Sequence, residues 1–64
     1  MTLCSMKVPA PCRNAATEIL HFREHQWSER WEEYPRCDEH PAADDIPMIM
    51  RMSPLAETRI EKVQ

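Results

Sequence analysis

Cys37-Asp38-Glu39-His40 places a thiol and an imidazole three positions apart within one short segment. Two intervening residues allow both side chains to reach a single metal ion from one tight turn. The chain has two other cysteines, Cys4 and Cys12, and both lie near the N-terminus. Three thiolates and one imidazole form a complete tetrahedral donor set for structural zinc. The sequence therefore predicts one Zn²⁺ ion bound by Cys4, Cys12, Cys37 and His40.

The length of the chain makes a stabilising metal plausible. With 64 residues, it is below the size at which an apolar core reliably stabilises a fold by itself. Three cysteines cannot all pair within one chain, and a reducing compartment keeps them as thiols. No apolar run approaches the roughly 20 residues that span a bilayer, and residues 1–4 lack the features of a signal peptide. We expect a single zinc-stabilised domain over residues 1–64, located in the cytoplasm and not associated with a membrane.

The segment 15–34, between the two pairs of ligands, fits two architectures. As a helix it has Asn14 as its N-cap and no proline or glycine. As a hairpin it has one strand over 16–22 and a returning strand that starts with 31–34, and a polar turn over 23–30 joins them. A helix of this length extends ~30 Å and carries Cys37 away from Cys12, whereas a hairpin brings them together. We therefore predict a small α+β domain with a β-hairpin between the ligand pairs, and the alternative is an α-rich fold with a long helix over 15–34.

The flanking segments complete the expected domain. Residues 1–11 form an extended arm with a strand over 3–8, and the zinc module covers 12–40. Residues 41–52 are expected to be a linker that ends in a short strand over 48–52. Ser53 is a good N-cap and Pro54 suits the first helical position, so we predict a C-terminal helix over 53–63. Such a short helix needs to pack against the zinc module or a partner.

Two motifs carry a resemblance to a known group of proteins. They are Pro11-Cys12-Arg13-Asn14-Ala15-Ala16-Thr17 and, after a mixed apolar stretch, Cys37-Asp38-Glu39-His40-Pro41-Ala42. This arrangement resembles the small Cys₃His zinc-binding proteins of actinobacteria and their phages, which are similar to zinc-ribbon and treble-clef modules. The resemblance covers about residues 4–42 and implies a metal more than a function. The chain departs from the pattern in its wide first cysteine pair and in having no glycine.

A second pattern of potential ligands lies inside the expected hairpin. His21-Phe22-Arg23-Glu24-His25 fits the H-x-x-E-H motif of some zinc proteases. A protease needs a further ligand, a substrate cleft and a much larger chain, so we expect no catalytic residues and no enzymatic activity. A variant of the metal site would combine His21 and His25 with Cys37 and His40.

The charge of the chain argues against nucleic acid as the partner. Eight basic and eleven acidic residues give a net charge of −3. Binding of Zn²⁺ by three thiolates makes the protein about one unit more negative, because three protons leave and two charges arrive. The basic residues are scattered singly and do not form the stripe that phosphate binding favours.

Aromatic residues in a polar stretch indicate a protein partner instead. Trp27, Trp31 and Tyr34 are candidate partner-binding residues, because tryptophan and tyrosine are enriched at binding hot spots. We therefore predict a non-enzymatic, zinc-stabilised protein-interaction module, encoded by a phage and acting on a host protein, which also forms homodimers. The alternative is a small zinc-finger-like transcriptional regulator that binds nucleic acid.

Overall fold

A β-hairpin forms the centre of the domain. The computed structural model describes residues 2–7 and 10–63, and the two strands of the hairpin are β1 (Glu18–Arg23) and β2 (Glu32–Arg36). The predicted hairpin between the ligand pairs is confirmed. The alternative long helix over 15–34 is wrong, because both strands lie within that range. β1 contains two residues that favour strands, Ile19 and Phe22, and it gains backbone partners on both of its edges.

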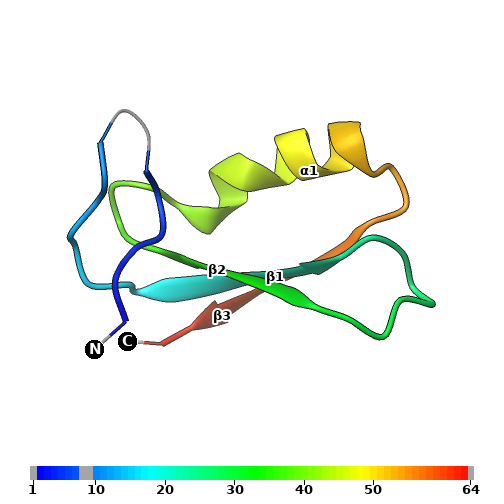
Figure 1. The fold of residues 1–64 in the computed structure, drawn as a ribbon, viewed down its shortest axis with the longest axis horizontal. Coiled ribbons are helices and arrows are strands. Elements are labelled where there is room, and N and C mark those ends of the chain that lie inside the picture. Colours follow the sequence, from blue (N-terminus) through cyan, green and yellow to red (C-terminus); the bar gives the residue numbers. More distant parts are fainter. Residues whose placement is uncertain (1, 8–9, 64) are drawn as a thin grey trace.

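A third strand completes an antiparallel sheet. β3 (Glu57–Lys62) pairs with the second edge of β1, so the strand order is β2-β1-β3. Leu20 lies opposite Tyr34 on one side and Ile60 on the other. A 3₁₀ turn, η1 (Ala42–Asp45), leads into the helix α1 (Ile46–Met52), which lies over one face of the sheet (Figure 1). The chain is therefore a small α+β domain, as the sequence predicted.

The helix does not lie where the sequence predicted a helix. Residues 48–52, which we expected to form a strand, belong to α1. Pro47 lies in the first turn of this helix, where its missing N–H removes no intrahelical bond, and methionine is a good helix former. No helix in the described part of the chain is long and apolar enough to cross a membrane.

The third strand replaces the expected C-terminal helix over 53–63, which is wrong. The Ala56 N–H donates to the Ser53 carbonyl at 2.9 Å, so Ser53 and Pro54 open a turn. After this turn, β3 forms backbone hydrogen bonds along β1. A helix as short as the predicted one would be only marginally stable by itself. The strand expected over 3–8 is reduced to one bridge between Leu3 and Ala15, and its residue 8 lies outside the described residues, as do residues 1 and 9 of the arm.

The buried core is small. Leu20 and Cys37 are the largest fully buried side chains, and the other buried apolar residues are Cys4, Ala16 and Ala42. The accessible surface is 4965 Å². A compact protein of this mass is expected to expose about 4300 Å². The fold therefore needs stabilisation beyond its apolar core.

Two buried charged residues connect the segment after the hairpin to the sheet. The Arg36 Nε donates to the Asp45 carboxylate at 2.6 Å, and the Arg36 guanidinium also donates to the Ser5 hydroxyl. The Glu18 carboxylate accepts from the Ala42 N–H at 2.7 Å and from the Lys62 ammonium at 3.1 Å. These contacts fix η1 and the turn that precedes it against the start of β1 and the end of β2.

Replacing Glu18 with glutamine is expected to destabilise the protein at neutral pH and to reduce its sensitivity to acid. The Ala42 N–H and the Lys62 ammonium hold the pKa of Glu18 below its ordinary value of 4.5. The charged carboxylate therefore stabilises the fold above pH 4.5, and this contribution is lost as the pH falls through the lower pKa of the folded state.

We expect Glu18→Gln to lower the free energy of unfolding by about 1–2 kcal/mol at neutral pH, with the difference vanishing in acid. Urea unfolding of both proteins, from neutral pH to well below pH 4.5, measures the difference. Glu29→Gln, at an exposed loop position, is the matched control. A difference that does not change with pH would contradict the assigned role of the Glu18 charge.

Candidate metal centre

The N-terminal arm brings the two early cysteines together beside the start of β1. The Cys4 N–H donates to the Asn14 carbonyl at 2.9 Å, so the arm lies along the segment that enters the strand. The Cys12 N–H donates to the Met6 carbonyl at 2.9 Å, so Cys12 lies beside the arm that carries Cys4. The two early cysteines are therefore close in space despite their wide spacing in the sequence.

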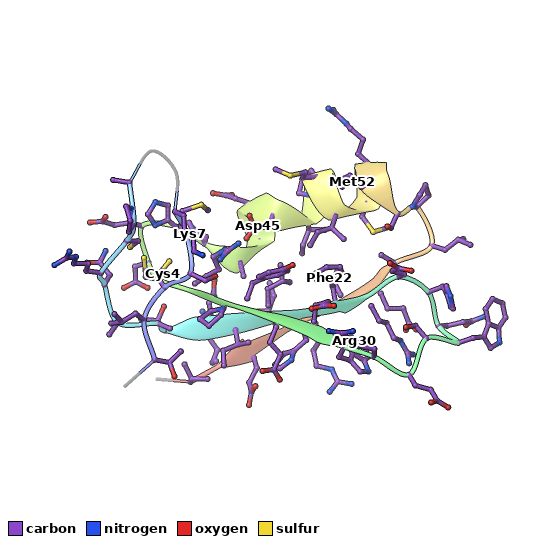
Figure 2. All side chains as sticks on the ribbon, in the orientation of Figure 1. Cys4, Lys7, Phe22, Arg30, Asp45 and Met52 are labelled. Carbon is purple, nitrogen blue, oxygen red and sulfur yellow. The ribbon has the colours of Figure 1, made fainter. Side chains whose placement is uncertain are left out.

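The later two potential ligands lie in the turn that follows β2. Cys37 comes directly after the strand, and the His40 N–H donates to the Cys37 carbonyl at 3.0 Å. The Thr17 hydroxyl donates to the Asp38 carboxylate at 3.2 Å and holds this turn against the base of β1. Figure 2 shows Cys4 at the same end of the sheet, where the arm meets the loop after β2. The hairpin thus brings both pairs of ligands to one place.

The four potential donor atoms have the spacing of a tetrahedral zinc site. The sulfur atoms of Cys4, Cys12 and Cys37 and a ring nitrogen of His40 all lie within 4.8 Å of one another. A zinc ion with bonds of about 2.3 Å to sulfur and 2.0 Å to nitrogen places two sulfurs about 3.8 Å apart, and a sulfur about 3.5 Å from the nitrogen.

Three of the individual separations agree with this geometry. The Sγ atoms of Cys12 and Cys37 are 3.7 Å apart, and the His40 Nδ1 lies 3.5 Å from the Cys37 Sγ and 3.8 Å from the Cys4 Sγ. The sulfurs of Cys12 and Cys37 are thus close enough to share one ion and too far apart for a disulfide, and all three cysteines are free thiols. The donor set can hold a metal ion, with His40 binding through Nδ1.

The environment of the thiols favours at least one thiolate at neutral pH. Burial raises the pKa of the Cys37 thiol, but His40, the Asn14 amide and the Glu39 backbone outweigh it and lower the pKa to about 6. For Cys12, a backbone hydrogen bond from Asn14 lowers the pKa, while burial and the neighbouring sulfurs raise it above its ordinary value. Since a thiolate is the form that binds metal, Cys37 is prepared for binding before an ion arrives.

Asn14 is a site residue that the sequence did not predict. Its side-chain amide donates to the Cys37 Sγ at 3.6 Å, while its backbone carbonyl accepts from Cys4. It thereby connects a ligand of the first pair with a ligand of the second. The available signal was its position two residues after Cys12, but we interpreted Asn14 only as a helix N-cap.

The H-x-x-E-H pattern does not contribute to this cluster. His21 lies in β1, with its Nε2 2.9 Å from the Glu61 carboxylate and its Nδ1 3.5 Å from the Glu33 carboxylate. His25 lies in the turn after the strand, where its Nδ1 accepts from the Trp27 N–H at 3.2 Å. The motif needs a helix to place both histidines on one face, and the chain forms a strand and a turn here. Within residues 2–7 and 10–63, the cluster that can hold a metal contains Cys4 and neither of these histidines.

The three predicted partner-binding aromatics do not form one surface. Trp27 lies in the hairpin turn with 74% of its surface exposed. Trp31 lies on the face of the sheet away from α1, with the guanidinium groups of Arg23 and Arg59 at 4.6 and 5.6 Å from its ring. Tyr34 lies on the α1 side and stacks on Phe22 with ring centroids 5.4 Å apart.

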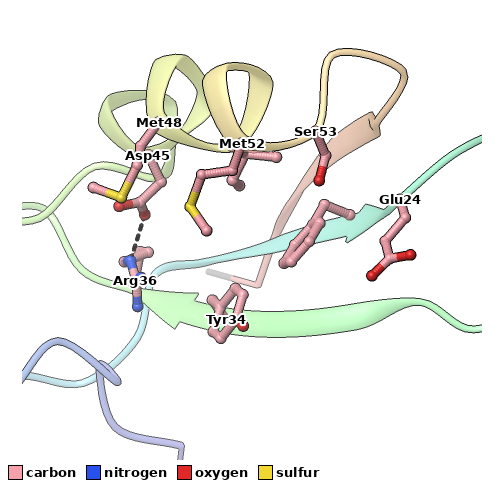
Figure 3. A pocket seen from close by; sticks show the side chains of 9 residues that line it. Glu24, Tyr34, Arg36, Asp45, Met48, Met52 and Ser53 are labelled. Atoms are coloured by element: carbon pink, nitrogen blue, oxygen red, sulfur yellow. Dashed lines mark hydrogen bonds and ion pairs between the residues drawn. The ribbon is translucent and has the colours of Figure 1, made fainter.

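A groove between α1 and the sheet is a second potential site. It has a volume of about 380 Å³, and its walls come from β1, β2 and α1 (Figure 3). Met52 points from the helix toward Tyr34 on the sheet, and Met48 lies beside Asp45. The ion pair between Arg36 and Asp45 closes one end of the groove. The sequence did not predict this groove, because it placed a strand where the structure has α1.

No protein-family model, curated protein or solved structure matches the chain. The function is therefore inferred from the cluster of four potential metal donors and from the groove between α1 and the sheet.

Proposed function

We propose that Cys4, Cys12, Cys37 and His40 bind one structural Zn²⁺ ion, and that the protein is a non-enzymatic, zinc-stabilised protein-interaction module. The observation that carries the proposal is the convergence of the four donor atoms at separations typical of a tetrahedral site. Four protein ligands fill the coordination sphere and leave no position for water or substrate. This arrangement is typical of structural zinc and not of catalytic zinc.

The location of the cluster supports a structural role. Its ligands come from the N-terminal arm, from the loop before β1 and from the turn after β2, so one ion would join three segments. Two of them, Cys4 and Cys37, are buried members of a core that contains few large apolar side chains. A metal there stabilises the base of the hairpin, and α1 and the groove depend on that base through Asp45 and Arg36.

A protein with a basic, partly apolar segment is the partner that we propose. The net charge of −3 becomes more negative when zinc binds, which favours a basic partner. The groove offers apolar contacts from Phe22, Met48 and Met52, and Glu24 lies at one end with an exposed carboxylate (Figure 3). On the resemblance to phage proteins, this partner is a protein of the bacterial host.

One feature favours the alternative function, which is nucleic-acid binding. Arginine and tryptophan side chains stack on bases, and the Trp31 ring contacts the guanidinium groups of Arg23 and Arg59. The same face of the sheet carries three carboxylates, however. Glu57 pairs with Arg23 at 2.9 Å, and Glu33 and Glu61 flank His21. Because these groups repel phosphate, we favour the protein partner.

Native mass spectrometry of untagged protein tests the metal part of the proposal. We expect one zinc ion per chain, and no stable zinc adduct for the variant in which Cys37 and Cys12 are both serine. Wild-type protein that carries no zinc after expression in zinc-supplemented medium would overturn this part.

Affinity capture from a host lysate tests the partner, together with fluorescence anisotropy on mixed-sequence DNA and RNA. We expect a protein that wild type retains and that Met52→Glu loses, since this change places a charge at the rim of the groove. Glu29→Gln, in the exposed hairpin loop, should retain it. Binding of DNA or RNA at moderate salt, without a protein lost by Met52→Glu, would favour the transcriptional regulator instead.

A further inference from the structure

β3 is an open edge of the sheet. Among the residues that the structure describes, this strand pairs only with β1, and its residues 59–62 are exposed. The other edge strand is protected, because the Ser5 N–H donates to the Pro35 carbonyl at 2.9 Å and the proline itself offers no donor. An edge with free backbone groups is a template for a further strand.

The register shows which backbone groups of β3 point outward. The Val63 N–H donates to the carbonyl of Thr17, which lies directly opposite it at 3.1 Å. In an antiparallel ladder, hydrogen-bonded and non-hydrogen-bonded pairs alternate. The N–H and C=O groups of Thr58, Ile60 and Lys62 therefore point away from β1, toward the position of a fourth strand.

The side chains of β3 are complementary to a second copy of the same strand. Arg59 and Glu61 lie on one face of the sheet, and Ile60 lies on the other. If two copies pair antiparallel with Ile60 opposite the partner's Ile60, then Arg59 lies opposite the partner's Glu61, and Glu61 lies opposite the partner's Arg59. These charged pairs occupy the non-hydrogen-bonded positions, where opposing side chains approach most closely.

We propose that two copies of this chain associate through β3 in this register and form one continuous antiparallel sheet of six strands. Each copy contributes a three-stranded sheet, and the outward backbone groups of Thr58, Ile60 and Lys62 bond with those of the other copy. A two-fold axis through the pair of Ile60 residues relates the copies, so the assembly closes at a dimer. The contact itself involves neither the four metal-donor residues nor the residues that line the groove.

The order of charges selects this register over its neighbours. A pairing centred on Arg59 places two arginines opposite each other and Glu57 opposite the partner's Glu61. A pairing centred on Glu61 places two glutamates opposite each other. A shift of one residue moves the side chains to the wrong faces. Like charges in opposite positions are destabilising, so only the pairing centred on Ile60 gains from the charges on β3.

The side chains are available for these contacts. Glu61 accepts from His21 at 2.9 Å but is 56% exposed, and a carboxylate accepts several hydrogen bonds. The Arg59 guanidinium lies 5.6 Å from the ring centroid of Trp31 and is exposed, so it can turn toward the partner. Ile60 is 38% exposed on the opposite face and becomes buried against its copy.

Charge reversal tests the proposal by sedimentation velocity over a concentration series. Arg59→Glu and Glu61→Arg each replace two attractive pairs by two repulsive ones, so each should raise the dimer dissociation constant at least about tenfold. The double variant Arg59→Glu with Glu61→Arg restores opposite charges and should restore dimerisation. Arg51→Glu makes the same charge change on the exposed side of α1 and should leave the dimer unchanged.

Thr58→Pro provides a test that does not depend on charge. It removes an outward N–H while leaving the β1–β3 ladder intact, so it should weaken the dimer while circular dichroism stays that of wild type. Wild type that remains monomeric at its highest soluble concentration would overturn the proposal. Single reversals that dimerise like wild type, or a double variant that fails to recover, would overturn it equally.

Discussion

Removal of zinc is expected to unfold the protein at neutral pH. Structural zinc contributes about 10–16 kcal/mol to the folding of small zinc domains, which exceeds the total stability of most domains of this size. The cluster joins the arm to both ends of the hairpin, and few other buried groups hold these segments together. Chelation of the wild type and the variant Cys37→Ser should both abolish the circular dichroism of the sheet and the dispersion of amide signals, and zinc should restore the chelated protein.

Two variants act as controls for this prediction. Glu39→Ala changes an exposed residue within the same turn and should retain one zinc ion and the fold. Cys4→Ser tests the ligand with the widest sequence spacing and should weaken zinc binding as Cys37→Ser does. A chelated protein that keeps its sheet and its amide dispersion would show that the cluster is not the stabilising element.

Replacing Leu20 with alanine is expected to cost about 2–5 kcal/mol of unfolding free energy in the zinc-loaded protein. Leu20 is fully buried in the central strand, between Tyr34 and Ile60 on the neighbouring strands. Its truncation leaves a cavity in a core with no other apolar side chain of comparable size and burial among the described residues. Urea unfolding with excess zinc measures the loss.

Leu55→Ala is the matched control, because it removes the same atoms from a side chain that is 72% exposed. It should change the free energy of unfolding by less than about 0.5 kcal/mol. Equal effects of the two substitutions would mean that the centre of the sheet does not form the core.

The hairpin and the convergence of the four donors could be predicted from the sequence. Both followed from one constraint, which is that Cys12 and Cys37 can share an ion only if the intervening chain returns to its start. Local propensity favoured a helix over the same residues, so the long-range constraint was more informative than the local pattern. Only the three cysteines and His40 provide this constraint, but their spacing in the sequence restricts the path of the backbone between them.

The exchange of helix and strand after residue 46 could not be predicted in this way. Met48-Ile49-Met50-Arg51-Met52 is too short for its periodicity to distinguish a strand from a helix. Ser53 and Pro54 suit both the first turn of a helix and a β-turn. The open edge of β1 decides the outcome, because β3 gains a full row of backbone bonds there. That edge exists only once the hairpin has formed, so no local signal reports it.

The arrangement of the surface aromatic residues also could not be predicted from the local sequence. Trp27, Trp31 and Tyr34 were grouped because they are close in sequence, yet they lie in a turn and on two opposite faces. The groove was missed because it forms between α1 and the sheet, and both of its walls had to be placed first.

The late position of β3 in the chain has a consequence for synthesis on the ribosome. All four donors lie within residues 4–40, whereas β3 pairs with β1 across the interval from Glu18 to Lys62. The segment with all four potential donors therefore leaves the ribosome before the third strand does. During that interval the backbone N–H and C=O groups on one edge of β1 have no partner strand, and they are prone to pair with other chains. A chain that stops after α1 would keep this edge permanently, so truncated products are expected to aggregate even when they carry zinc.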